Sequence, residues 1–351
     1  METLLELSKI NSNNSRIINS LIPEDHKSPL RKLNHILQNT KYALDESKVM
    51  NEIYGKKNTA AFARLKSRMK DILLRATILQ NIGLESAESR INESYNQFRY
   101  TLVSKILKDL KAERLSVDIA EKALIKSIKF QTTENTVLLL RSLVRHYGAR
   151  EFNKYKLSKY LSLQKKYLKI FEWEIKAENF HLDLQRIQLH SLAAPGVSTI
   201  EKARLYVKEI ESVKDIASVN FNLNKYRIKA SLLEYENDYN SLLKLCEESL
   251  VNFSIPELKS GVIIQNINLS KMLSLIQLGR NEDAVVMGQK ELSKISSGSL
   301  GWYFLAHYTL KSMIYQSQYS KAIFLIKQMV ENQKYSKLGE NYKELFNTTL
   351  G

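Results

Sequence analysis

Few side chains in this sequence have the type and spacing that catalysis or metal binding needs. Glu178 and His181 are three residues apart, which would place both on one face of a helix, as in di-iron helical bundles. Such a site needs a second motif of this kind and further glutamates, and no other histidine in the sequence follows a glutamate at this spacing. The alternative is an ordinary solvated polar face. We therefore expect no bound metal and no cofactor.

Motifs for phosphate binding or nucleophilic catalysis are also missing. The segment Gly298-Ser299-Leu300-Gly301 resembles a serine elbow only superficially, because no glycine-x-serine-x-glycine pattern is present. The single cysteine, Cys246, follows the apolar run Leu242-Leu243-Lys244-Leu245, so no intrachain disulfide can form. Its surroundings predict a small buried hydrophobic residue. We expect a protein that is not an enzyme.

The chain is strongly basic, with 53 lysines and arginines against 37 acidic residues and a net charge of +16. Residues 1–150 hold 26 basic and 16 acidic residues, against 27 and 21 in the remainder, so the basicity is concentrated toward the N-terminus. Such a charge attracts nucleic-acid phosphates, anionic lipids or acidic proteins. The alternative is a lysine-rich solvated helical surface.

The most basic stretch is a predicted helix of about twenty residues that begins at Asn58 or Thr59 and follows two short helices. Only Asp71 opposes its cations. These are Lys56, Lys57, Arg64, Lys66, Arg68, Lys70 and Arg75. A helix-turn-helix module would place such a helix in the major groove of DNA. The alternative is the outer face of a structural helix, where basic side chains cover apolar surface. A winged helix is disfavoured because another helix, and not a β-hairpin, is predicted to follow.

Nothing in the sequence predicts a membrane protein or a secreted one. The N-terminal residues Met1 to Glu6 lack the basic and apolar regions of a signal peptide. No stretch approaches the ~18 apolar residues of a membrane span. We therefore predict a cytoplasmic protein.

The elements that must position these side chains are predicted to be helices. Only 4 prolines and 11 glycines occur in 351 residues, which favours long helices over a turn-rich β fold. One helix is predicted over residues 151–193, broken by Ala193-Ala194-Pro195-Gly196; about 40 residues would span roughly 60 Å. The helix before residue 110 has one stripe at helical period. It consists of Ile91, Tyr95, Phe98, Leu102, Ile106 and Leu110.

The last third of the chain repeats one apolar pattern three times. The three copies are Leu233-(x8)-Leu242-(x7)-Leu250, Leu275-(x8)-Ala284-(x7)-Leu292 and Met313-(x8)-Ala322-(x7)-Val330. A polar turn precedes the middle position of each copy. Self-similarity of this kind is typical of stacked helical hairpins. We predict helix pairs over 219–235 and 239–252, 258–278 and 281–295, and 300–316 and 319–333.

These repeats resemble the tetratricopeptide (TPR) family over about residues 218–333. The segments 275–284 and 316–322 match the end of a TPR first helix, its turn and the small residue that opens the second helix. The middle positions are 42 and 38 residues apart, longer than the family's period of about 34. The layout as a whole is similar to helical-repeat proteins of Bacteroidetes-type bacteria. The resemblance implies a fold and names no ligand.

We therefore predict an all-α fold, a right-handed α-solenoid of antiparallel helix pairs that is TPR-like in its C-terminal half. The predicted domains are a basic helical segment over 1–84, irregular hairpins over 85–194 that end in the long helix, and TPR-like repeats over 195–351.

The predicted function is a non-catalytic scaffold or adaptor that binds a protein or peptide, preferably acidic, in a helical groove. The groove contacts are predicted on the first helix of each pair. They are Tyr226, Lys229, Asn268, Lys271, Ala306 and Thr309. The alternative is a regulatory nucleic-acid-binding protein that uses the basic helix over 56–75.

Overall fold

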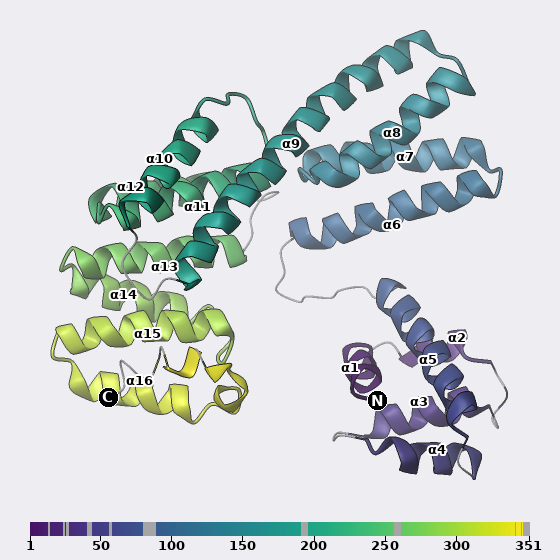
Figure 1. Cartoon of the computed structure of the whole chain (residues 1–351), viewed down its shortest axis with the longest axis horizontal. Coiled ribbons are helices and arrows are strands. Elements are labelled where there is room, and N and C mark those ends of the chain that lie inside the picture. Colours follow the sequence, from purple (N-terminus) through teal and green to yellow (C-terminus); the bar gives the residue numbers. More distant parts are fainter. Residues whose placement is uncertain are drawn as a thin grey trace. The chain divides into compact units, whose positions relative to one another are not determined.

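The computed structural model describes residues 1–12, 15–23, 25, 28–40, 44–55, 58–79, 89–190, 196–255, 261–340, 342–344 and 346. All regular secondary structure in these residues is helical, which confirms the all-α class (Figure 1). The chain divides into two compact units, Met1–Glu85 and Ser86–Gly351, called unit 1 and unit 2 below. The domain boundary predicted after residue 194 falls within 191–195, outside the described residues, and stays a prediction.

Unit 1 is a cluster of short helices packed on one longer helix. Its helices are α1 (Glu2–Ile10), α2 (Ser15–Leu21), α3 (Pro29–Asn39), α4 (Glu46–Tyr54) and α5 (Thr59–Leu79). Helix α5 packs against α1, α2 and α3 and contributes Phe62, Met69 and Leu73 to the core. The Asp45 carboxylate caps α4 by accepting a hydrogen bond from the Ser47 N–H at 2.8 Å. Gly55, at φ +69°, ends α4 in the left-handed conformation that glycine adopts without strain.

Unit 2 is a row of helices in which chain neighbours pack on one another. They are α6 (Ser89–Asp109), α7 (Glu113–Lys129), α8 (Thr133–Ala149), α9 (Lys154–His190), α10 (Val197–Glu211), α11 (Val219–Tyr235), α12 (Tyr239–Asn252), α13 (Gly261–Gln277), α14 (Asn281–Leu292), α15 (Leu300–Tyr315), α16 (Tyr319–Val330) and the 3-10 helix η2 (Tyr335–Lys337). Helix α9 corresponds to the long helix predicted over 151–193 and runs without interruption for 37 residues. It packs against α8 and also against α10 and α11, so one helix joins the two parts of the row (Figure 1).

The three predicted repeats share one turn geometry. Asn237, Gly279 and Ser317 each have a positive φ, of 55°, 72° and 54°. In each turn the following N–H donates to the carbonyl five residues earlier: Asp238 to Leu233, Arg280 to Leu275 and Gln318 to Met313, at 2.8–2.9 Å. This is the Schellman closure of a helix, and the next helix begins immediately after it. The polar turns of the sequence therefore form three equivalent helical hairpins.

Burial alternates along these hairpins. The first helices α11, α13 and α15 bury residues around most of their circumference, whereas α12, α14 and α16 bury one face. The middle positions of the repeat, Leu242, Ala284 and Ala322, are all buried, and Ala284 is small enough to let neighbouring helices approach. The last position differs: Val330 is 47% exposed, so the third copy does not bury its final apolar residue.

Helix α6 buries polar side chains and exposes apolar ones, whereas an ordinary surface helix does the reverse. Most of the stripe predicted from its sequence lies outward, including Tyr95, Leu102 and Ile106, and Leu110 just after the helix is 71% exposed. Its inward face carries the buried polar residues Gln97, Thr101 and Ser104. The period predicted the helix correctly, but the apolar side does not face the core.

The close approach of α14 to α15 depends on Gly288, and this gives a stability prediction. A Cβ atom at position 288 would lie 2.1 Å from Thr309 Oγ1 and 3.0 Å from Thr309 Cβ. That hydroxyl also donates to the Leu305 carbonyl at 2.7 Å, so it has little freedom to move. We expect Gly288→Ala to lower the free energy of unfolding by about 2 kcal/mol, measured by urea denaturation.

The matched control is Gly148→Ala in α8, where the nearest atom, Leu157 Cδ1, would lie at an ordinary 3.4 Å. Alanine favours helix over glycine by up to about 1 kcal/mol, so this variant should be neutral or stabilised. Equal effects of the two substitutions would contradict the close packing at Gly288.

Candidate functional site

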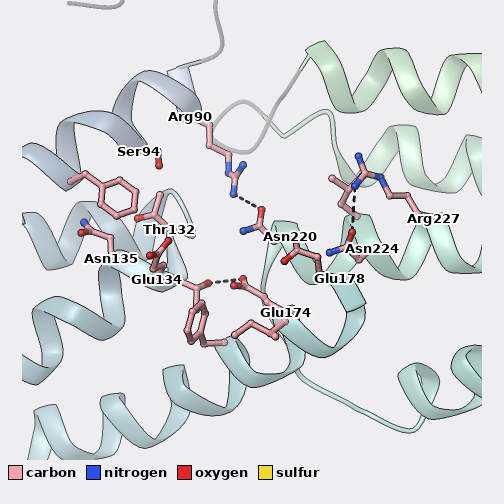
Figure 2. A pocket seen from close by; sticks show the side chains of 15 residues that line it. Arg90, Ser94, Thr132, Glu134, Asn135, Glu174, Glu178, Asn220, Asn224 and Arg227 are labelled. Carbon is pink, nitrogen blue, oxygen red and sulfur yellow. Dashed lines mark hydrogen bonds between the residues drawn. The ribbon is translucent and has the colours of Figure 1, made fainter. Parts of the chain in front are cut away.

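A cavity in unit 2 is lined mainly by polar and charged side chains (Figure 2). Its volume is about 440 Å³, and it lies among α6, the start of α8, α9 and the first half of α11. The lining includes Arg90, Ser94, Phe98, Thr132, Thr133, Glu134, Asn135, Phe171, Glu174, Ile175, Glu178, Asn220, Leu223, Asn224 and Arg227. This size is in the range of small-ligand and peptide-anchor sites.

Two polar stripes line the cavity. Glu174 and Glu178 are one turn apart on α9, and Asn220, Asn224 and Arg227 follow one face of α11. Because α9 packs directly on α11, these stripes lie close to one another, and Figure 2 shows Glu178 among Asn220, Asn224 and Arg227. Two helices that would normally meet through apolar residues here keep charged groups at a cavity.

Glu174 is buried, at 5% exposure, and holds three helices together. Its Oε1 accepts a hydrogen bond from Thr133 Oγ1 at 2.7 Å and another from Ser218 Oγ. Thr133 begins α8, and Ser218 is the N-cap of α11, where its Oγ accepts from the Phe221 N–H at 3.1 Å. Burial raises the pKa of the Glu174 carboxyl, and the two hydroxyl donors oppose this rise only in part.

The two arginines of the cavity are held by asparagine side chains. Arg90 donates from Nε to the Phe130 carbonyl at 3.3 Å and from Nη2 to Asn220 Oδ1 at 3.2 Å. Arg227 donates from Nη1 to Asn224 Oδ1 at 3.4 Å. No carboxylate of the described residues lies within ion-pair distance of Arg227. Burial lowers the pKa of its guanidinium, and the charge of Glu178 opposes that shift.

His181 extends the α9 stripe beyond the cavity. Burial, with a smaller contribution from the positive charge of Arg227, lowers its pKa to about 4, so its imidazole is neutral near pH 7. Its buried Nδ1 has no hydrogen-bond partner. Glu178 and His181 lie one turn apart on α9, as the sequence predicted, but no group of three metal-binding side chains occurs among the described residues.

The lining brings the carboxylates of Glu134, Glu174 and Glu178 together with the guanidinium groups of Arg90 and Arg227. Arg227 is half-buried and lacks an ion pair among the described residues, so its guanidinium could bind a carboxylate or phosphate that reaches it. The described lining has no serine or cysteine beside a histidine base, so nothing in it indicates nucleophilic catalysis.

The predicted groove contacts do not form a surface, and four of them need correction. Ala306 and Thr309 are fully buried in α15. Asn268 is buried and donates to Glu291 Oε2 at 3.1 Å, and the hydroxyl of buried Tyr226 lies 3.5 Å from Cys246 Sγ. These side chains are core because α11, α13 and α15 each pack between other helices.

The two predicted lysine contacts are more accessible. Lys229 pairs with Glu211 at 2.8 Å, and Lys271 pairs with Glu247 at 2.9 Å. Lys229 and the edge of Tyr226 line a second cavity of about 520 Å³ between α11 and α12. Their charges are thus already balanced by carboxylates of the chain.

The predicted nucleic-acid contacts fall into three groups. Arg64, Arg68, Lys70 and Arg75 are exposed on α5. They form no ion pair with any described residue. Lys66 instead pairs with Glu46 and lies over the Phe62 ring at 5.4 Å. Lys56 and Lys57 lie outside the described residues.

Sequence reasoning missed the cavity residues. Glu174, Asn224 and Arg227 belong to no motif, and Arg90 is distant from them in sequence. One signal was available: polar residues recur at helical spacing, at 174, 178 and 181 and at 220, 224 and 227.

Comparisons with protein-family models, with curated proteins and with solved structures found no match to this chain. Within the described ranges, the helices are all too short or too polar to cross a membrane.

Proposed function

We propose that the chain is a non-catalytic, cytoplasmic scaffold or adaptor that binds an acidic segment of a partner protein. Unit 2 is proposed to be a right-handed α-solenoid whose C-terminal hairpins are TPR-like. Three equivalent turns and the alternation of buried and half-buried helices support this architecture. Contacts between α6 and α8 and between α13 and α15 support it as well, because successive layers of a solenoid pack in this way.

Arg227 is the observation that carries the proposed function. Its guanidinium is partly buried at the polar cavity, has one asparagine acceptor and lacks an ion pair among the described residues. A partner's aspartate, glutamate or C-terminal carboxylate would supply the missing acceptor with two parallel hydrogen bonds. The carboxylates of Glu178 and Glu134 also line the cavity and repel an acidic ligand, so such a ligand would have to enter on the side where the arginines lie. The proposed ligand is therefore one acidic group on a longer protein segment.

The test compares partner capture by three tagged full-length chains in nuclease-treated native lysate. Loss of one member of a desolvated charge pair costs about 2–5 kcal/mol, so Arg227→Gln should lose the protein that the wild type retains. The matched control is Arg186→Gln, which removes an arginine that is 70% exposed on α9 and should retain that protein. Identical capture by Arg227→Gln and wild type would contradict the proposal.

Nucleic-acid binding by α5 is a second candidate function. Arg64, Arg68 and Arg75 lie at spacings of four and seven residues and so share one face of the helix, whereas Lys70 lies on the opposite flank. All four are exposed and free of ion pairs to described residues, in contrast to Lys66. The three unneutralised arginines on this face can contact successive phosphates without further rearrangement.

This candidate predicts salt-dependent binding of double-stranded DNA. Three phosphate contacts give a slope of about −2.7 for log K against log salt, measured by fluorescence anisotropy. Arg64→Glu combined with Arg68→Glu should reduce the magnitude of that slope by about 2, whereas Lys48→Glu on α4 should leave it unchanged. A slope near zero for the wild type would rule the candidate out.

A further inference from the structure

Helix α6 turns polar side chains toward the core and most of its apolar side chains toward the solvent. Its inward residues pack through hydrogen bonds: Ser104 and Ser116 exchange hydroxyl-to-carbonyl bonds of 2.9 and 2.7 Å, and Thr101 donates to Asn135 at 2.7 Å. The hydrophobic residues of α6 are left on the solvent side. A helix that turns polar groups inward and apolar groups outward indicates that the outward face is covered by something.

A groove between α6 and α7 lies on the flank of α6, beside the outward stripe, and Tyr95, Leu102 and Ile106 do not line it. A cavity of about 230 Å³ there is lined mainly by apolar atoms of Tyr100, Ile119 and Ala123. Val103 of α6 and Leu115 of α7 continue the apolar surface toward the turn, at 40% and 51% exposure. We call Tyr100, Val103, Leu115, Ile119, Lys122 and Lys126 the α6–α7 face. None of them lines the polar cavity of Figure 2.

Gln97 marks the floor of this groove. Its side chain is fully buried and lines the cavity, and its Nε2 donates to Glu93 Oε2 at 2.9 Å. Its Oε1 is buried and has no hydrogen-bond partner. Because an unpaired buried acceptor costs about 1–3 kcal/mol, the groove gains from an occupant that brings a hydrogen-bond donor.

The side chains beside the groove are positively charged, and this charge bears on which partner can bind there. Lys122 and Lys126 stand along its rim on α7, and Lys126 has only a distant partner, Glu93 at 3.8 Å. Lys122 has no ion pair with a described residue. A second copy of the chain would bring two lysine rims together in one contact, which like-charge repulsion opposes. Charge complementarity instead favours an acidic partner.

We infer that the α6–α7 face binds an amphipathic helix of a partner protein that carries acidic residues beside its apolar stripe. A groove between two antiparallel helices accepts residues spaced at i, i+3, i+4 and i+7. Such a helix would stack on α6 as each following helix of unit 2 stacks on its neighbour. Its apolar stripe covers Tyr100, Val103 and Ile119, and its carboxylates meet Lys122 and Lys126. This surface is additional to the cavity that carries the proposed function.

The test uses the full-length chain and two synthetic helical peptides with the same leucine stripe, one flanked by glutamates and one by lysines. Fluorescence anisotropy measures both affinities. We expect the acidic peptide to bind at least about tenfold more tightly than the basic one. The double variant Lys122→Glu, Lys126→Glu should reverse this preference, and Val103→Asp should abolish binding of both peptides. Lys290→Glu on α14 is the matched control and should behave as the wild type.

The variants change exposed or rim side chains, and unchanged thermal unfolding would show that each still folds. Equal affinity for both peptides, or no binding of either, would overturn the inference. Binding to phosphatidylserine vesicles that is lost in the same variants would assign the face to a membrane instead. Dimerisation by analytical ultracentrifugation that Val103→Asp abolishes would assign it to a second copy. Because Arg227 is intact in all these variants, failure here leaves the cavity proposal unaffected.

Discussion

Replacement of Glu174 by alanine should lower the free energy of unfolding of unit 2 by about 2–4 kcal/mol. The substitution leaves the hydroxyls of Thr133 and Ser218 buried without their acceptor, at the junction where α9 meets the starts of α8 and α11. Urea unfolding followed by tryptophan fluorescence measures the loss directly, because Trp173 and Trp302 both lie in unit 2.

The same residue gives unit 2 a pH dependence whose sign follows from its raised pKa. The folded state holds the Glu174 proton to higher pH than the unfolded state, whose carboxyl titrates near its ordinary value of 4.5. Stability therefore falls as pH rises above about 4.5 through the folded pKa. Both Glu174→Ala and Glu174→Gln should lack this contribution.

Glu174→Gln separates the hydrogen bonds from the charge. The amide oxygen can still accept from one of the hydroxyls at nearly the same volume, so we expect its effect at neutral pH to stay within about 1 kcal/mol of the wild type. If the alanine variant were as stable as the glutamine variant, Glu174 would not be the residue that joins the three helices.

Much of the fold could be predicted because short-range rules decide it. Pro29 in a first turn, Asp45 as a cap and Gly55 as a terminator act within a few residues, and each is found where its type predicts. The spacing of the repeats could also be predicted from the sequence. Each hairpin buries the middle residue of its repeat, and a small residue such as Ala284 at that position recurs with the hairpin.

The direction in which each helix faces depends on tertiary neighbours and could not be predicted in the same way. Helix α15 packs against α13, α14 and α16, so Ala306 and Thr309 are buried although their positions suggested a groove. Helix α6 shows the reverse, because its polar residues find partners such as Ser116 and Asn135 on other helices. A period of 3.6 establishes a stripe, and only packing decides which side is inside.

The cavity was invisible in the sequence for a related reason. Arg90 and Asn220 are 130 residues apart, yet their side chains are hydrogen-bonded. Neither residue type is unusual, and no spacing rule connects them. Polar residues that recur one helical turn apart, such as Glu174 and Glu178, are the sequence signal that such cavities leave.

A large pH effect is expected at Glu234 in α11. Burial raises the pKa of its carboxyl to about 7, and its side chain accepts no hydrogen bond from any described residue. The unfolded chain releases this proton near pH 4.5, whereas the folded chain holds it to about pH 7. Each pKa unit is worth about 1.4 kcal/mol, so ionised Glu234 destabilises the folded state by about 3 kcal/mol above pH 7.

Glu234→Gln should therefore be more stable than the wild type at pH 8 and equal to it near pH 4.5, with the gain growing as pH rises between those values. The control is Glu248→Gln on α12, an exposed residue with no ion pair among the described residues, which should not reproduce this gain in stability. Urea denaturation at several pH values measures both differences. Since Gln removes only the ionisation, a Glu234→Gln variant that loses stability at pH 8 would mean that the carboxylate has a favourable partner at this position.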